Sequence, residues 1–575
     1  MFKSTLFNQF LALQYQAFKE LPAIIKTLFI LAFLVGSGVR ILGLFNLGLY
    51  FDMIYTQYTW GKTAFEMGLF GFWQNYPMSK HFDYPQLSLL YEFLIVSLMS
   101  LFGKSDERTF VGIVKIVNWA VDLLIPISIL WLGQKFNPKN KQNIQLSFGL
   151  AGLSYVLPSI WFVSGIWGQN DSFVVLVTLG CLGLLFSQKN WKLESTTSQK
   201  TISNIDKIWY KNLAFWSGVL FAFGFWVKQQ PILLVPILGL YFVYNKTWKD
   251  LVTAFFWFLP FLSSFGAFGS IYTEQQRFYE NPFYQILRVF GLDYPTISNW
   301  GIMTNAGILI LLTSLLMLAF KLHQKGVWRE LRLWLFGFLL LTNVVSLPAI
   351  ILNNIRYARV SFAPFIRGDS IANGATNFWG IFPQFKSAND PVLDFANVQL
   401  SVRLSGLLAY LIIFAATVFV ILKPPLQPRK WLKLQTFWQK EVSFPKALIL
   451  MWISSSSYFL FFTNMHSRYL HFGILYALFV LAVNISEAHK KWFKIWFLGV
   501  LVLHFWYLLN QMLVFGANST TPTWVGQFTT WFGSGELGAD PWWWSSFGIS
   551  ITFATMLVLL AFVFGAKNLI KEKSV

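Results

Sequence analysis

The sequence predicts an all-α polytopic membrane protein, and three observations support this fold class. Of its 575 residues, 55% are hydrophobic, only 12% are charged, and the mean hydropathy is +0.54. A soluble domain carries about 25% charged residues, so a chain this apolar needs lipid as its solvent. Aromatic residues make up 19% of the chain, and Trp and Tyr gather where a membrane meets water.

The apolar runs are the elements of this fold. A helix needs about 20 apolar residues to cross a membrane, with a range of roughly 17–25, and about fourteen runs come close to that length. The predicted spans are 24–45, 110–133, 146–165, 172–188, 212–227, 230–245, 251–272, 301–320, 333–352, 403–422, 446–463, 470–486, 495–515 and 545–566.

One further apolar run, 86–103, decides the topology, because counting it as a span reverses the side of every later loop. If it lies in the non-cytoplasmic layer as a juxtamembrane or re-entrant helix, the Lys-rich loops and both termini are cytoplasmic. We prefer this topology because basic residues concentrate on the cytoplasmic side. The alternative is that 86–103 spans and one shorter predicted span does not. The Lys-rich loops are 134–143, 188–211, 321–332, 423–440 and 490–494.

Charge and cysteine content exclude two classes of function. The formal net charge is +20, but nucleic-acid binding places basic residues on one soluble face. Here Lys and Arg form short clusters between apolar runs, so we expect no nucleic-acid partner. Cys181 is the only cysteine in the sequence, which excludes an intramolecular disulfide and a cysteine-based metal site.

The preferred topology divides the chain into two membrane modules with cytoplasmic ends. Residues 1–23 form an interfacial segment, 24–320 the first module, 321–566 a more variable second module, and 567–575 a tail. The long loops lie on the non-cytoplasmic face and are rich in Trp, Tyr, Pro, Gly and Asp. We expect the functional site there, because loops on a rigid scaffold carry sites. These loops are 46–109, 273–300, 353–402 and 516–544.

The first long loop carries four candidate residues. Asp52 follows the first span, and a carboxylate there can act as a general base; the alternative is a solvated residue or a helix cap. His81, Asp83 and Tyr84 precede Pro85, which disfavours helical backbone before it and suits the first turn of the following helix. Asp83 therefore either binds substrate or caps that helix.

Two short connections between spans carry the next candidates. Trp167, Gln169 and Asp171 belong to the turn WGQND, where polar groups are costly unless protein or a wet cavity surrounds them. The alternative is that Asp171 only caps the next helix. Lys228 ends a span near the same face. It either binds a lipid phosphate as a point charge or extends its ammonium group to the interface without a ligand.

A third connection, MHSRY, places His466, Arg468 and Tyr469 between two spans. Arginine can hold a phosphate through two parallel hydrogen bonds, and the three residues together indicate an anion more specifically than each does alone; the alternative is a structural turn.

The loop 353–402 either covers the site, grips an acceptor or forms a structural lid. Its polar and aromatic candidates are Arg356, Arg359, Arg367, Asn373, Asn377 and Trp379.

The order of these motifs resembles the GT-C superfamily of integral membrane glycosyltransferases. An acidic residue after the first span is followed by FDYPQL, VDLLI, GIWGQND, KQQP and MHSRY. The set is similar to dolichyl-phosphate-glucose-dependent glucosyltransferases and to bacterial relatives with a DYPP motif. Two positions depart from these patterns: Gln86 stands in place of the second proline, and Ser467 in place of the glutamate of MHERY. A role of that glutamate therefore does not transfer to this chain.

The resemblance implies a GT-C fold and an enzyme, a polyprenyl-phosphate-sugar-dependent hexosyltransferase. Such an enzyme transfers a monosaccharide, with inversion, to a lipid-linked glycan or another acceptor on the non-cytoplasmic face. By position, Asp52 matches the catalytic base and Asp171 the polar position of the second loop, where it counts as catalytic too. The implied substrate-binding residues are His81, Asp83, Tyr84, Trp167, Gln169, Lys228, His466, Arg468 and Tyr469.

Relatives of this kind require no cofactor, because protein cations serve the monophosphate, so no metal ligand is predicted. A divalent ion between Asp52 and Asp171 is the alternative.

A different function class, a transporter or flippase of a lipid-linked or polar solute, needs charged groups inside the spans. The sequence places few there: Arg40, Lys115 and Asp122.

A non-catalytic scaffold is a third reading of the same pattern. The short loops favour a prokaryotic plasma membrane; in a eukaryote the location would be the endoplasmic reticulum. In either membrane the expected partners are a polyprenyl-phosphate-linked sugar donor, a glycan or lipid acceptor, and membrane lipid.

Overall fold

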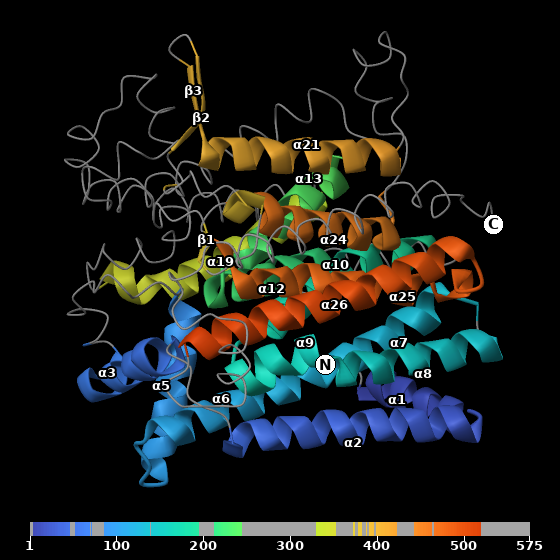
Figure 1. Cartoon of the computed structure of the whole chain (residues 1–575), viewed down its shortest axis with the longest axis horizontal. Helices are drawn as coiled ribbons and strands as arrows, with labels where there is room; N and C mark the ends of the chain where they lie inside the picture. The colour runs from blue at the N-terminus through green and yellow to red at the C-terminus, as the bar shows by residue number, and fades with distance from the viewer. Residues whose placement is uncertain are drawn as a thin grey trace.

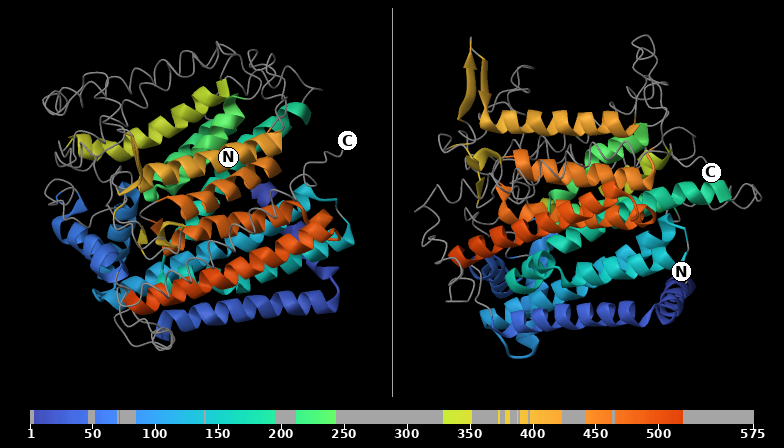
Figure 2. Two further views of the ribbon diagram at one scale, coloured as in Figure 1. Left: turned by 45° about the horizontal axis from the view of Figure 1, so that its top comes forward. Right: turned by 45° about the vertical axis from the view of Figure 1, so that its right-hand side comes forward.

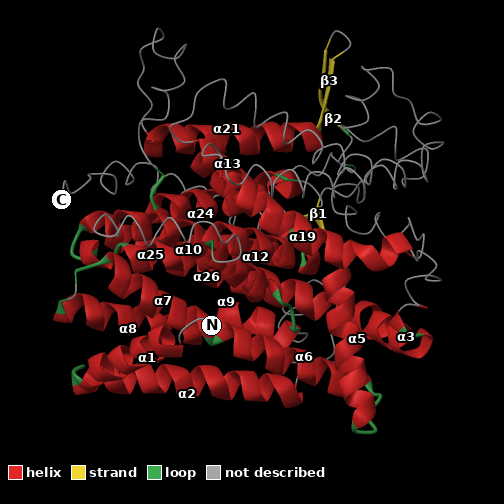
Figure 3. Ribbon diagram, turned by 180° about the vertical axis from the view of Figure 1, so that it is seen from behind, coloured by secondary structure: helices red, strands yellow, loops and turns green. Residues whose placement is uncertain are grey.

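The computed structural model is mainly helical over the residues that it describes, and its long helices run side by side along one common direction (Figures 1 and 3). Three predicted spans, 251–272, 301–320 and 545–566, lie outside these residues. The described residues are 4–46, 52–69, 71, 85–138, 140–194, 212–243, 329–351, 372–373, 378–381, 387, 390–395, 398–422, 442–462 and 465–518.

Four described helices are long and apolar enough to cross a membrane. A fifth candidate is a bent pair, Lys141–Val156 and Pro158–Trp167, with an angle of 44° between its parts. Every predicted span within the described residues coincides with a helical segment, although several are shorter than a bilayer requires. The four long helices are Ala23–Leu44, Glu107–Phe136, Val402–Ile421 and Phe444–Phe461.

The first helices form one side of the bundle. Helix α1 (Ser4–Lys19) precedes α2 (Ala23–Asn46), which lies at the opposite side of the bundle from α21 (Val402–Leu422), as Figures 1 and 2 show. Gln14 of α1 and Gln134 exchange two hydrogen bonds of 2.7 Å. Because both carboxamides are satisfied by each other, α1 is fixed against the bundle at little polar cost.

A small helical layer covers one end of the bundle, at the left of Figure 1. It consists of the π-helix η1 (Asp52–Tyr58), α3 (Thr59–Met67) and α5 (Gln86–Leu101). Helix α5 runs at a steep angle to the long helices (Figures 1 and 3). It packs closely on α3 because Gly61 has no side chain; a Cβ there would lie 2.8 Å from the carbonyl oxygen of Glu92.

A proline divides the next segment of the bundle. Helices α6 (Glu107–Asp122) and α7 (Leu124–Phe136) lead to α8 (Lys141–Val156), which ends before α9 (Pro158–Trp161) and the π-helix η2 (Phe162–Trp167). Pro158 has no N–H group to continue the hydrogen bonds of α8. Because α8 ends before Pro158, its last carbonyl groups have no partner within the helix. Arg40 donates to the carbonyl oxygen of Tyr155 at 3.0 Å, and the Trp161 indole donates to that of Val156 at 3.1 Å. Side chains thus satisfy the freed carbonyls, as the interior of a membrane bundle requires.

Glycines allow α12 (Leu213–Val227) and α19 (Arg329–Ile351) to pack closely. Helix α10 (Asp171–Glu194) packs on α12, and α12 packs on α19. A Cβ at Gly218 would overlap the carbonyl of Trp334, and one at Gly337 would overlap that of Phe215. Small residues at such crossings let the backbones approach, which is how helices associate without a hydrophobic driving force.

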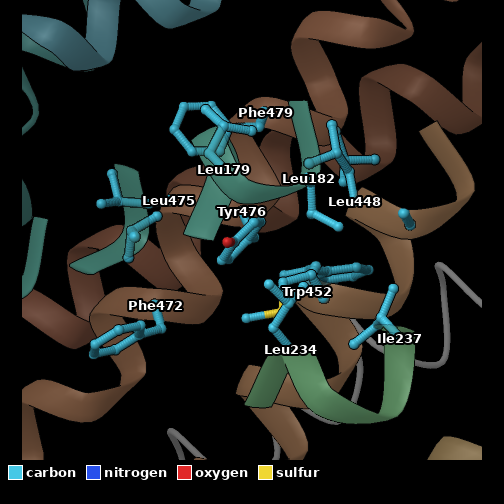
Figure 4. Close-up of a cluster of buried hydrophobic side chains, with 14 of the residues drawn as sticks. Leu179, Leu182, Leu234, Ile237, Leu448, Trp452, Phe472, Leu475, Tyr476 and Phe479 are labelled. Atoms are coloured by element: carbon cyan, nitrogen blue, oxygen red, sulfur yellow. The ribbon is translucent and has the colours of Figure 1, made fainter. Parts of the chain in front are cut away.

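The apolar centre lies among α10, α13 (Val235–Val243), α24 (Phe444–Phe461) and α25 (Leu470–Val483), as Figure 4 shows. All residues of α25 are buried. Tyr476 points its hydroxyl into this cluster, where it hydrogen-bonds Thr178, beside the ring of Trp452. The remaining elements of this part are the 3-10 helices η4 (Gln230–Leu234) and η7 (Ile485–Glu487) and the helix α26 (Lys491–Asn518).

Short strands occur although the sequence predicts an all-α chain. Strand β1 (Ala372–Asn373) pairs in parallel with β4 (Met465–His466), and β2 (Pro391–Phe395) pairs antiparallel with β3 (Val398–Ser401). Strands of two to five residues leave too short a pattern to be detected as alternation in the sequence. They accompany the 3-10 helices η5 (Phe378–Ile381) and η6 (Ser467–Tyr469).

Candidate functional site

Three segments far apart in the sequence meet at the end of the bundle that the small helical layer covers. Asp171 begins α10, Lys228 follows α12, and Arg468 lies in η6 before α25. The Lys228 ammonium hydrogen-bonds Oδ1 of Asp171, and Nε of Arg468 lies 3.9 Å from its Oδ2. The structure therefore brings together one candidate from each of three predicted connections.

This charged cluster is buried. The side chains of Asp171, Lys228 and Arg468 are at most 3% exposed. Charges are expensive to remove from water unless they are paired, and here two cations share one carboxylate. The three side chains together carry one positive charge, which favours an anionic group as their neighbour.

A left-handed glycine shapes the turn before Asp171. Gly168 ends η2 with φ +83°, a conformation that favours glycine because it has no Cβ. The backbone N–H of Gln169 donates to the Val163 carbonyl at 2.9 Å, and Nδ2 of Asn118 donates to the Gly168 carbonyl at 2.8 Å. This turn directs Gln169, which is 1% exposed, into the protein.

The start of the first long loop contacts the same turn. Asp52 is the first residue of η1, and its side chain lies outside the described atoms. Its neighbour Met53 is fully buried, with its sulfur 4.0 Å from Nε2 of Gln169. A Cβ at Gly168 would lie 3.2 Å from Cε of Met53. The backbone of Asp52 is thus one residue from the contact that joins η1 to the WGQND turn.

Aromatic rings surround the guanidinium of Arg468. Its central carbon lies 5.7 Å from the centre of the Trp167 ring and 5.9 Å from that of Tyr469. Cations are attracted to ring faces within about 6 Å. Tyr507 of α26 donates to the backbone carbonyl of Arg468 at 3.0 Å. These contacts fix the position of Arg468 and explain why Trp167 and Tyr469 belong to the same site.

The long loop 353–402 reaches this site through its backbone. Asn373 of β1 stands opposite His466 of β4, the residue two positions before Arg468. Trp379 donates from its indole nitrogen to the Phe461 carbonyl at the end of α24 at 2.5 Å. The loop therefore joins the segment before Arg468 at two points. The side chains of Asn373 and His466 lie outside the described atoms.

Several functional-site candidates were not found from the sequence. Asn118, His471, Tyr507 and Gln511 are all buried beside the cluster or on helices that contact it. His471 comes three residues after Arg468, a spacing that places both on one side of a helical turn, and it lies 3.0 Å from the Ser172 hydroxyl. That spacing was an available signal. His81, Asp83 and Tyr84, which the sequence analysis proposed, lie outside the described residues.

A second buried ion pair lies inside the bundle. Arg40 of α2 donates to Oδ2 of Asp122 from Nη2 at 2.7 Å and from Nε at 3.2 Å. The hydroxyl of Ser164 also donates to this oxygen, and the guanidinium lies 4.4 Å from the Tyr155 ring centre. Lys115, the third predicted intramembrane charge, donates to the Gly43 carbonyl at 3.1 Å. These contacts join α2, α6, α8 and η2 in the bundle interior.

Among the described residues, no group of three His, Cys, Asp or Glu side chains could hold a metal ion. Lys228 contacts one oxygen of Asp171 and so supplies a positive charge next to it. The proposed alternative of a divalent ion between Asp52 and Asp171 stays a prediction.

No protein-family model and no curated protein matches this sequence. Function must therefore be argued from the site and its chemistry rather than from relatedness.

Proposed function

We propose that this chain is an integral membrane glycosyltransferase of the GT-C type. It transfers a monosaccharide from a polyprenyl-phosphate-linked donor to a lipid-linked glycan or another acceptor on the non-cytoplasmic face. The observation that carries the proposal is the buried cluster of Asp171, Lys228 and Arg468. A buried group of three charges that sums to one positive charge suits the phosphodiester of such a donor, which carries one negative charge, at the membrane surface.

The cluster supplies what the leaving group needs. When the bond between the sugar C1 and the phosphate oxygen breaks, the electron pair stays on the phosphate. Arg468 can form two parallel bonds to phosphate oxygens, while Lys228 acts as a compact charge. Fixed cations in a site without water stabilise such developing charge strongly. Asp171 holds both cations in place and, with Gln169, orients sugar hydroxyls.

Asp52 completes the reaction as the general base. It accepts the proton of the acceptor hydroxyl, and the acceptor oxygen attacks C1 from the side opposite the phosphate. A single displacement of this kind inverts the configuration at C1. The contact of Met53 with Gln169 supports this assignment, because Met53 follows Asp52 in η1 and Gln169 lies two residues before Asp171.

The same proposal includes the topology. The lengths of the apolar runs give about fourteen spans, and the short loops favour a prokaryotic plasma membrane. The distribution of basic residues gives cytoplasmic termini and a non-cytoplasmic site. The steep angle of α5 to the long helices supports a position of 86–103 along the membrane surface. Labelling of single cysteines at Lys104 and Lys141 from outside intact cells tests this; we expect labelling only at the first.

The experiment on function uses purified full-length protein in proteoliposomes with a panel of radiolabelled polyprenyl-phosphate monosaccharides and acceptor lipid extracts. We expect transfer from one donor, and Asp52→Asn to lower the rate by about 10²–10⁴-fold, the contribution typical of a general base. Asp106→Asn is the matched control, because Asp106 is a carboxylate of the same face that only caps α6. Full transfer by Asp52→Asn at normal membrane levels would remove Asp52 from the mechanism.

A second candidate function is transport or flipping of a lipid-linked or polar solute. The Arg40–Asp122 pair beside the broken helix α8–α9 favours it, because intramembrane charges and discontinuous helices are typical of transporters. Fluorescent lipid-linked sugars in the same proteoliposomes separate the two functions. Movement across the bilayer without cleavage of the sugar–phosphate bond supports transport, and cleavage supports transfer.

A further inference from the structure

Gln511 of α26 is a buried polar group that the proposed chemistry does not yet use. It is 0% exposed, and neither its Oε1 nor its Nε2 has a hydrogen-bond partner among the described residues. Oε1 of Gln169, which is 1% exposed, also has none there. A buried polar atom without a partner is costly and requires an explanation. Two such carboxamides near one site point to a ligand.

Helix α26 brings Gln511 to the proposed site. Tyr507, one helical turn earlier, hydrogen-bonds the backbone of Arg468. Leu508 and Met512 pack in one apolar cluster with Met53 and Trp167. Residues three and four positions apart lie on the same side of a helix, so Gln511 lies on the side that faces η1 and η2.

The unpaired atoms indicate what kind of group they bind. Both carboxamides offer a carbonyl oxygen, which needs a donor, and Nε2 of Gln511 needs an acceptor. A phosphate oxygen accepts hydrogen bonds only and would leave both carbonyl oxygens unpaired. A hydroxyl donates and accepts, so neighbouring hydroxyl groups satisfy the whole set. Sugars present such groups at the spacing of adjacent ring carbons.

We infer that Gln511, with Gln169, binds hydroxyl groups of the donor sugar. The second membrane module then contributes to sugar recognition through α26, while Arg468 and Lys228 bind the phosphate. This inference depends on the proposed function, because it assumes a sugar-bearing lipid donor. It adds a specificity residue from a segment that carries no recognisable motif.

The test compares the binding of two probes to the full-length protein in lipid nanodiscs: polyprenyl phosphate without a sugar, and the monosaccharide-bearing polyprenyl phosphates of the same chain length. Wild-type protein should bind one sugar-bearing lipid more tightly than the bare lipid. Gln511→Leu should reduce this ratio of dissociation constants by about tenfold, because a site built for hydroxyl groups discriminates strongly through them. Affinity for the bare lipid should not change.

Stability provides an independent readout. Replacement of an unpaired buried carboxamide by an apolar side chain of similar size should leave the melting temperature unchanged or raise it. A structural hydrogen-bonding role would lower it. Gln14→Leu is the matched control: it removes a carboxamide paired with Gln134 in another part of the bundle and should lower stability without changing the ratio. If Gln511→Leu fails to fold, Gln511→Asn, which shortens the amide, should reduce the ratio instead.

The outcomes separate the two proposals. An unchanged ratio in a folded Gln511 variant, with both probes still bound, overturns the role of Gln511 and leaves the phosphate site standing. Wild-type protein that binds neither probe overturns the proposed function and this inference with it.

Discussion

Two groups of buried charges in the described part of the chain differ in how their charges balance. In the bundle interior, Arg40 and Asp122 match one to one, and the guanidinium also bonds the backbone carbonyls of Gly36 and Tyr155 at 3.0 Å. At the covered end of the bundle, Asp171 is shared by two cations, and Arg468 lies 3.9 Å away. The first arrangement joins helices; the second has two cations for one carboxylate.

The comparison teaches that burial of charge does not by itself mark a functional site. A buried pair whose two charges cancel, such as Arg40 with Asp122, connects helices, and breaking it affects folding. A buried group with one shared carboxylate and a net charge is more useful for binding. Intramembrane charges are functional candidates by default, and the net charge of each group distinguishes the two here, since both Asp122 and Asp171 keep one carboxylate oxygen without a hydrogen bond.

The largest expected effect is on the interior pair. Arg40→Leu leaves the Asp122 carboxylate buried without its cation, which should lower the free energy of unfolding by about 3–5 kcal/mol. The loss of stability is measured as a lower melting temperature in detergent, with the folded fraction at each temperature determined by size-exclusion chromatography. Removal of Asp122 as well should restore part of the loss. Lys62→Ala, which breaks an exposed pair with Glu66 at 3.9 Å, should change stability by less than about 1 kcal/mol. Equal losses of stability in Arg40→Leu and Lys62→Ala would show that the buried pair stabilises the protein no more than the exposed pair does.

The next effect is on binding at the covered end. Arg468→Lys keeps the charge but loses the planar fork that holds phosphate, so we expect kcat/KM for the lipid donor to fall by about 10²-fold at normal protein levels. Arg40→Lys makes the same chemical change in the interior pair. It should lower stability and leave the KM for the donor unchanged. Loss of donor affinity in both variants would show that the pairs act as one unit.

The smallest effect concerns a charge outside both clusters. Asp106 caps α6 by accepting from the Thr109 amide at 2.9 Å and hydroxyl at 2.7 Å, and these hydrogen bonds lower the pKa of its carboxyl group. Such a cap contributes about 1 kcal/mol. Because the folded-state pKa is the lower one, its charge-dependent stabilisation is present above the unfolded pKa of about 4 and is lost as pH falls through the folded pKa.

Asp106→Asn keeps a capping oxygen but cannot titrate. The melting-temperature difference between wild type and this variant should therefore shrink as the pH falls from about 6 to about 3. A constant difference across this range would show that the charge of Asp106 contributes nothing to the cap. Transfer activity at neutral pH should not change, since this residue only begins a helix.

The helices and the connections between them could be predicted from the sequence because apolar length and turn residues are local properties. Predicted spans such as 403–422 and 446–463 coincide with α21 and α24 within two residues at each end. The motifs WGQND and MHSRY were also visible locally, and the structure places Asp171 and Arg468 of these motifs together. The run 86–103 was set apart by charge distribution, and it forms a helix with its own direction.

Other features needed the packed chain. The sequence predicted Lys228 as a phosphate ligand or as an ammonium group extended to the interface, and it did not indicate the contact with Asp171. The break at Pro158 likewise gave no indication that Arg40 would satisfy the Tyr155 carbonyl. The strand pair of Asn373 with His466 joins segments about ninety residues apart, and two-residue strands carry no detectable period. Gln511 lies in a helix of ordinary apolar composition, so no local pattern distinguishes it.

The sequence by itself determined that this is a helical protein with long apolar segments and that its polar turns gather the candidate residues, since both depend on neighbours within about 20 residues. The tertiary structure decided which charges meet. Lys228 contacts Asp171 across 57 residues, and Tyr507 contacts Arg468 across 39. Such pairs are set by how helices cross and by which glycines let them approach, and this information is distributed over the whole bundle rather than written beside each residue.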